Sequence, residues 1–278
     1  MGRRGFEQPG EGIGQPVEWT RASGWSRRRF VGAGLGGLAA PILLGCGGAD
    51  PTGPGLSSDP RLTARPGMPT LPPPPGRSDL GLNAQRDGFM YVPSGYSSAI
   101  PAPLFVALHG AGVSSSDWQG YIQYAEDRGF VLLAPDSRAL SWDIAEVGYF
   151  GPDVTFIDRA LEHTFDRCRI DATRIALAGF SDGASYALSL GVSNGDLFTH
   201  LIAHSAGFFT PAAPIVGKPP VFQSHGTNDP ILPINSGRFI EGLLRDDGYD
   251  VTFEQFDGGH QLPFTISQDA LDWFLDVN

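Results

Sequence analysis

From about Gly81 onward, short apolar segments alternate with segments whose apolar residues recur at helical spacing. The first kind is typical of buried strands and the second of amphipathic helices. Because consecutive parallel strands need a connecting helix, this alternation predicts a mostly parallel central sheet with helices on both faces. The chain therefore predicts an α/β fold in one compact domain over residues 81–278, with little or no lid.

The strands are expected at Phe89–Val92, Leu104–Leu108, Val131–Ala134, Ile175–Ala178, Leu201–Ala203, Val221–Gln223 and Val251–Phe256. The helices are expected at Asp117–Asp127, Asp153–Asp166, Asp182–Leu190, Ser236–Asp247 and Ile266–Val277. The helix that begins at Ser236 is expected to bury Phe239, Ile240, Leu243 and Leu244, which lie at helical spacing.

The sequence Gly179-Phe180-Ser181-Asp182-Gly183 lies between an expected strand and an expected helix. A Gly-x-Ser-x-Gly pattern in that context is typical of a nucleophile elbow, a tight turn that exposes its serine at the carboxyl edge of the sheet. The flanking glycines are required because side chains there would collide with the neighbouring strand and helix. Ser181 is therefore the expected nucleophile.

The same pattern recurs at Gly191-Val192-Ser193-Asn194-Gly195, but there it follows the end of a helix. Gly191 is interpreted as a helix C-terminal glycine and Asn194-Gly195 as a turn. Ser193 is therefore not expected to be a nucleophile.

A serine nucleophile needs a histidine base that is oriented by a carboxylate, and in folds with this elbow the acid and then the histidine follow the serine along the chain. Asp229 comes just after the strand that begins at Val221, and His260 just after the strand that begins at Val251. These two residues are the expected acid and base. Asp257 is a rival acid, but it would have to fold back sharply onto His260.

Asp182 follows the nucleophile directly, so its side chain is not expected to orient the base. Its backbone N–H is instead the expected donor to the oxyanion of the reaction, at the positive end of a helix dipole. The second expected oxyanion donor is the N–H of Ala111, in the Gly-rich sequence Leu108-His109-Gly110-Ala111-Gly112 after an early strand. A plain Gly-rich turn is the alternative interpretation of that segment.

Four segments, Leu108-His109-Gly110, the Ser181 elbow, His225-Gly226-Thr227-Asn228-Asp229 and Gly258-Gly259-His260, occur in an order that resembles the phospholipase/carboxylesterase branch of the α/β-hydrolase fold. Asp171-Ala172-Thr173-Arg174 is also similar to polyhydroxybutyrate depolymerase-like esterases. The elbow departs from the first group, which often has Gln at the position of Asp182 and Gly at that of Ala184. The resemblance covers residues 87–278.

The resemblance implies a serine esterase that acts through an acyl-enzyme on small or short-chain acyl esters. Ser141-Trp142-Asp143 resembles a pocket-lining segment of the carboxylesterase group, which implies that Trp142 contacts substrate, with a packing role as the alternative. His109 is also expected to line that pocket. A polyester-oligomer or feruloyl esterase, a serine peptidase of the same fold and a non-catalytic surface-binding relative remain as rivals. No histidine or cysteine cluster has metal-ligand spacing, so no metal or cofactor is expected.

The first 45 residues resemble an export signal. They contain Ser26-Arg27-Arg28-Arg29-Phe30 and then the apolar segment Val31–Leu44, and they are followed by Cys46 in the sequence Leu43-Leu44-Gly45-Cys46. These features resemble a twin-arginine signal followed by a lipoprotein cleavage site. Cys46 is then the expected lipidation site, which would make a membrane a partner of the mature protein. Export to the bacterial cell envelope is the expected localisation.

Residues 46–80 contain nine prolines between Pro51 and Gly76, so we expect an extended, disordered tether there. The other cysteine, Cys168, is in phase with the apolar face of an expected helix and is interpreted as a buried structural thiol. The net charge of −11 argues against a nucleic acid partner. The oligomeric state is not predicted.

Overall fold

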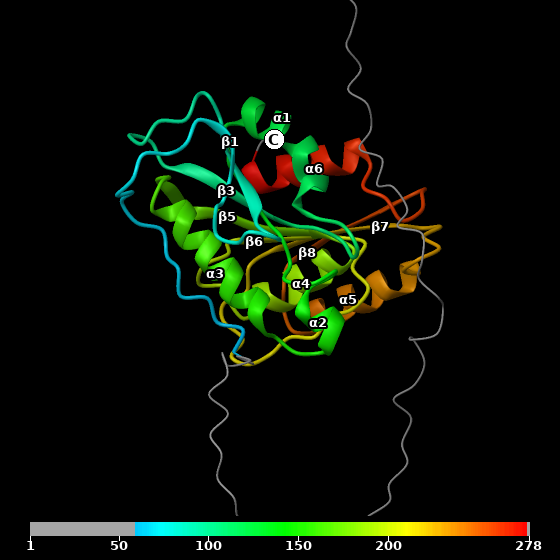
Figure 1. Ribbon diagram of the computed structural model, residues 1–278. Helices are drawn as coiled ribbons and strands as arrows, with labels where there is room; N and C mark the ends of the chain where they lie inside the picture. Colours follow the sequence, from blue (N-terminus) through cyan, green and yellow to red (C-terminus); the bar gives the residue numbers. More distant parts are fainter. Residues whose placement is uncertain (1–58, 277–278) are drawn as a thin grey trace, which may run out of the picture.

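The computed structural model describes residues 59–276, which form one eight-stranded sheet with helices on both faces (Figure 1). The strands lie in the order β1-β2-β4-β3-β5-β6-β7-β8, and all pairs are parallel except those that β2 makes with β1 and β4. Their bounds are β1 Gly76–Asp79, β2 Gly88–Val92, β3 Ala102–Leu108, β4 Val131–Pro135, β5 Ile170–Phe180, β6 His200–His204, β7 Val221–Gly226 and β8 Val251–Phe256. Every strand that the sequence predicts is present.

The helices divide between the two faces of the sheet. Helices α1 and α6 cover one face, and α3, α4 and α5 cover the other (Figure 1). The bounds are η1 Ser115–Gly120, α1 Tyr121–Arg128, α2 Asp143–Val147, α3 Pro152–Phe165, α4 Asp182–Gly191, α5 Ile234–Asp246 and α6 Phe264–Leu275. The sequence interpretation missed β1 and the short α2, and it merged the 3-10 turn η1 with α1, since none of these short segments has a full period of apolar residues.

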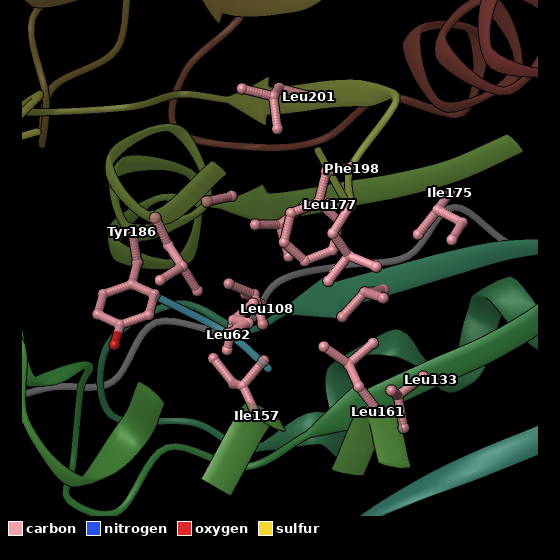
Figure 2. Packing of buried hydrophobic residues seen from close by; sticks show 14 of the residues in the cluster. Leu62, Leu108, Leu133, Ile157, Leu161, Ile175, Leu177, Tyr186, Phe198 and Leu201 are labelled. Atoms are coloured by element: carbon pink, nitrogen blue, oxygen red, sulfur yellow. The ribbon is translucent and has the colours of Figure 1, made fainter. Parts of the chain in front are cut away.

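Alternate residues of a central strand enter two different cores. In β3, Leu104, Val106 and Leu108 belong to the core beneath α3, α4 and α5, whereas Phe105 and Ala107 belong to the core beneath α1 and α6. This is the two-residue period of a strand that is buried on both faces. Figure 2 shows the larger core, in which strand and helix side chains meet. Both faces of the central strand are therefore buried, and its side chains join the two cores.

Residues 59–80 correct the expected boundary of the tether, because they are part of the folded domain. Leu62 is 2% exposed and packs in the larger core. Its backbone N–H donates to Asn194 Oδ1 over 2.9 Å, and Asn194 Nδ2 donates to Pro60 O over 2.8 Å. Asn194, in the second Gly-x-Ser-x-Gly sequence, therefore holds this N-terminal strap (residues 59–71) against the end of α4.

Ion pairs fasten the same strap. Arg61 and Arg65 both contact the Asp196 carboxylate, at 2.8 and 2.7 Å, and hold the pKa of that carboxyl well below its usual range. After the strap, β1 pairs antiparallel with β2, and Leu80 is buried. A proline-rich composition predicted a spacer, but tertiary contacts order the segment nonetheless. The expected export signal, Cys46 and the first part of the tether lie outside the described residues.

Two of the four α5 residues that the sequence predicted to be buried are exposed instead. Ile240 and Leu244 are buried, but Phe239 is 68% and Leu243 37% exposed. The apolar stripe of this helix is wider than the surface that the sheet covers.

Cys168 is buried as predicted, and burial raises the pKa of its thiol to about 12. Between residues 59 and 276, no helix combines the length and the hydropathy needed to cross a bilayer.

Candidate active site

Ser181 occupies the turn between β5 and α4 in a backbone conformation of φ 58° and ψ −120°. This conformation is rare for a residue with a side chain and costs about 1–3 kcal/mol. The flanking glycines allow it: a Cβ on Gly179 would lie 2.2 Å from the backbone of Gly183, and one on Gly183 would lie 2.2 Å from Leu108 O. The predicted strand, tight turn and helix are all present.

The three side chains that the sequence singled out form one hydrogen-bonded chain. His260 Nε2 lies 2.9 Å from Ser181 Oγ, and His260 Nδ1 lies 2.6 Å from Asp229 Oδ2. The carboxylate can only accept, so Nδ1 carries the proton and Nε2 is free to accept the serine hydroxyl proton. The serine follows β5, the aspartate β7 and the histidine β8, so all three meet at the carboxyl edge of the parallel strands.

Asp229 is held by four donors. Its Oδ1 accepts from the backbone N–H groups of Ile231 and Leu232, each over 2.8 Å. Its Oδ2 contacts His260 and lies 3.4 Å from His225 Nε2. Burial raises the pKa of this carboxyl, but the hydrogen bonds from His225 and His260 outweigh it and hold the pKa well below its usual range. The hydrogen bonds around Asp229 therefore favour the ionised carboxylate that the histidine needs.

His225 links the strand β7 to the loop that carries the acid. It is fully buried, and its Nε2 lies 2.7 Å from Leu232 O. The carbonyl can only accept, so this nitrogen carries a proton that is shared between Leu232 O and the Asp229 carboxylate. His225 thus orients the acid from beneath.

The rival residues have other partners. Asp257 Oδ1 accepts from Asn228 Nδ2 over 2.8 Å, a bond between two loops at the edge of the site. Ser193 Oγ donates to Ala212 O over 2.7 Å and is buried beyond the C-terminal end of α4. Asp257 therefore does not orient His260, and Ser193 is not placed as a nucleophile.

The loop after β3 lies directly beside the nucleophile. A Cβ on Gly110 would be 3.4 Å from Ser181 Cβ, so the absence of a side chain lets the two backbones approach. Gly112 N–H donates to Leu140 O over 2.7 Å, which fixes the loop that contains Ala111. Asp182 is the first residue of α4, where N–H groups have no partner within the helix. Both expected oxyanion donors are thus carried by backbone segments that flank Ser181.

The Asp182 side chain does not contact Asp229 or replace it. Its Oδ2 accepts from Ser141 Oγ over 2.6 Å, and Ser141 is 1% exposed. Burial raises the pKa of Asp182, while the bond from Ser141 and the nearby His260 lower it. The sequence indicated no partner for this carboxyl, because Ser141 is 41 residues away in the chain.

His109 and Trp142 do not line the pocket that the resemblance implied, since both are fully buried. Trp142 Nε1 donates to His109 O over 2.8 Å, and its ring stacks on Tyr186 of α4. His109 Nε2 accepts from the backbone N–H of Ser137 over 3.0 Å, and burial lowers the pKa of this imidazole to about 4. Both residues support the loop after β3 from below, where no substrate can reach them.

Two buried carboxylates that the sequence did not indicate hold the segment before α3. Asp143 Oδ2 accepts from the N–H groups of Gly151 and Asp153, and Asp153 Oδ2 accepts from the N–H of Asp143 over 2.7 Å. Burial and the neighbouring Asp143 charge raise the pKa of Asp153 to about 7. This reciprocal pair positions Ser141 and Trp142, and through them the surroundings of the elbow.

Among residues 59–276, no group of three or more His, Cys, Asp or Glu side chains has the arrangement of a metal site. The site is instead a serine with a general base and a buried acid, an arrangement that can form and hydrolyse an acyl-enzyme. Together with the strand order, it defines the α/β-hydrolase fold, as the sequence resemblance implied.

Comparisons with known proteins agree with this fold. Residues 154–276 match the family described as Phospholipase/Carboxylesterase. Acetylxylan esterase A of Emericella nidulans is 30% identical over 147 residues, which are 48% of this chain and 48% of that protein. Acyl-protein thioesterase 1 of Neurospora crassa is 31% identical over 114 residues, which are 38% of this chain and 46% of that protein.

The chain thus spans about half the length of these two relatives. Among solved structures, the crystal structure of esterase PE8 matches with a TM-score of 0.58, over 70% of this chain and 100% of that chain, at 22% identity. That likeness is one of fold. The family match covers β5 to α6, and so includes Ser181, Asp229 and His260.

Proposed function

We propose that this protein is a serine carboxylic-ester hydrolase that acts on small or short-chain acyl esters. The observation that carries the proposal is the continuous contact from Ser181 Oγ through the His260 ring to Asp229 Oδ2. The family match and the acetylxylan esterase among the relatives support the same reaction class.

In the proposed reaction, Ser181 Oγ attacks the ester carbonyl carbon while His260 Nε2 accepts its proton. The backbone N–H groups of Asp182 and Ala111 stabilise the oxyanion that forms. His260 then returns the proton to the departing alcohol, which leaves an acyl group on Ser181. Water, deprotonated by the same imidazole, releases the acid and restores the serine. Asp229 holds the imidazole in the required tautomer throughout.

The test is hydrolysis of p-nitrophenyl acetate and butyrate by the wild-type protein and by Ser181→Ala. We expect the variant to lose at least about a thousandfold in kcat/KM, since the serine and its base act as one unit. Equal rates for the two proteins would end the proposal.

Reaction with a fluorophosphonate probe separates this proposal from a non-catalytic surface-binding relative, which should not be labelled. A peptidase would in addition cleave amide analogues of the ester substrates at comparable rates. A panel of short acyl, feruloyl, polyester-oligomer and thioester substrates distinguishes the esterase alternatives. Short acyl esters and thioesters are useful reference substrates, since one relative is named an acetylxylan esterase and another an acyl-protein thioesterase.

We further propose that the protein is exported by a twin-arginine signal and anchored to the bacterial cell envelope through lipid on Cys46. The support is the order of the Arg27-Arg28 pair, the apolar segment and Leu43-Leu44-Gly45-Cys46. In cells, a Cys46→Ala change should move the protein from the membrane fraction to the soluble fraction and abolish labelling by a lipid precursor. Arg27→Lys together with Arg28→Lys should retain it in the cytoplasm, and membrane association that survives Cys46→Ala would refute the anchor.

A further inference from the structure

The Asp182 carboxyl group lies beside the nucleophile and is held there from the interior. Asp182 follows Ser181 in the chain and is partly exposed at the start of α4. Its Oδ2 accepts from the hydroxyl of Ser141, a residue that is 1% exposed. The Asp143–Asp153 pair in turn fixes the segment that carries Ser141. This carboxyl is therefore a positioned group rather than a mobile surface charge.

Burial raises the pKa of the Asp182 carboxyl, and the hydrogen bond from Ser141 lowers it. Among residues 59–276, the charged groups that act on it are His260, which favours its ionisation, and Glu146 of α2, which opposes it. The two arginines of the neighbouring loops bond elsewhere: Arg86 donates to Ser137 O, and Arg138 donates to Asp136 O. The Asp229 carboxylate lies beneath His260, and Asp182 directly follows the nucleophile, so two acidic side chains flank the Ser181–His260 pair.

We propose that the Asp182 carboxylate sets the charge specificity of the site, so that it rejects esters with a negative charge near the reacting carbonyl. Neutral or cationic esters, above all those with a hydroxyl or ammonium donor within reach of Asp182, are the favoured class. The inference rests on the proposed esterase function and narrows its substrate. Two like charges about 7 Å apart at an effective dielectric constant of about 20 to 40 would lower kcat/KM roughly 10- to 50-fold.

The first experiment varies charge in the leaving group. Three phenyl acetates are compared at pH 8, with a meta carboxylate, a meta methyl ester or a meta trimethylammonium group, and each rate is divided by its rate of hydroxide hydrolysis. Wild-type protein should hydrolyse the anionic ester about 10- to 50-fold less efficiently than the neutral one. Asp182→Asn removes the charge but keeps the backbone N–H, so it should bring this ratio to within about threefold of one.

The second experiment varies charge in the acyl group, with the p-nitrophenyl ester of adipic acid and that of monomethyl adipate. The same change in ratio is expected for Asp182→Asn. The matched control is Asp257→Asn, which removes one negative charge from the loop after β8, where Asp257 contacts Asn228. This control should keep the wild-type ratio, because the proposal attributes the ratio to the position of the Asp182 charge and not to the net charge of the protein.

Ser141→Ala supplies a test that keeps the carboxyl in place. Loss of the hydroxyl donor should raise the pKa of Asp182, so discrimination against the anionic ester should disappear at a higher pH than in wild type. The proposal is overturned if the charge ratio is the same in wild type and Asp182→Asn for both substrate pairs, or if Asp257→Asn changes it equally. Absence of Ser181-dependent hydrolysis of the neutral esters would instead refute the esterase function itself.

Discussion

Ser181 combines a strained backbone with a fully formed set of contacts to its base. Its φ of 58° directs Oγ to His260 at 2.9 Å, and Ser181 N–H is tied to His204 O over 2.9 Å. The surrounding strands and glycines therefore maintain the conformation that the proposed chemistry needs. The two aspartates near it differ in environment: Asp229 accepts from four donors, whereas Asp182 faces one hydroxyl.

The two aspartates should accordingly respond differently to the same substitution. Asp229→Asn leaves the size of the side chain unchanged but favours the wrong tautomer of His260, so we expect kcat on a neutral ester to fall about 10³- to 10⁴-fold. Asp182→Asn preserves the backbone donor and should lower it less than about tenfold. Steady-state hydrolysis of p-nitrophenyl butyrate measures both, and equal losses would contradict these roles.

At the scale of secondary-structure elements, the segment from β4 to α3 supports the elbow. Its buried Asp143 and Asp153 exchange hydrogen bonds with backbone N–H groups, and its Trp142 ties α2 to α4 and to the loop after β3. Buried carboxylates this close repel each other when both are ionised. The close pair of carboxylates thus fixes the geometry of this segment, but their repulsion lowers the stability of the folded protein.

That cost should depend on pH. The pKa of Asp153 is raised from 3.8 to about 7, so between these values the folded protein binds more protons than the unfolded chain. The contribution of Asp153 to stability is therefore full below the lower value and is lost as pH rises towards about 7, by an amount on the order of 2 to 4 kcal/mol.

Urea denaturation at pH 5 and at pH 8 measures this fall. Asp143→Asn removes the repelling charge and should reduce the dependence, although the burial of Asp153 remains, whereas Asp257→Asn at the edge of the site should leave it unchanged. A wild-type protein that is equally stable at both pH values would show that Asp153 remains ionised despite its burial.

At the scale of the whole molecule, the domain is closed by residues that precede its sheet. The strap places Leu62 in the larger core, and Asn194 and Asp196 bind it at the end of α4. Strand β1 then covers β2 at the edge of the sheet. The folded unit therefore begins before Gly81.

Truncation tests this boundary. A chain that begins at residue 59 should match the full chain in thermal midpoint and esterase activity. A chain that begins at residue 81 loses the buried Leu62 and Leu80 and should be destabilised by several kcal/mol, at about 2–4 kcal/mol for a buried leucine. Thermal unfolding followed by circular dichroism compares their midpoints. Equal midpoints would show that the strap does not stabilise the fold.

The sequence alone predicted the features that depend on residues close together in the chain. The elbow depends on glycines within two residues of Ser181, and the strands on apolar segments long enough to be buried, so both could be predicted from single segments. The order of serine, acid and histidine after successive strands was sufficient to select Asp229 and His260 from all the acidic residues and histidines.

Only the tertiary structure decided the features that depend on contacts distant in sequence. The proline-rich composition of residues 59–75 could not reveal that Asn194 and Asp196 would bind them, because those partners lie some 130 residues further on. Nor could a motif tell whether Trp142 faces substrate or packs on Tyr186. Side-chain burial and the pairing of Asp182 with Ser141 arise only when separate elements pack together, and these set the charge that a substrate would meet.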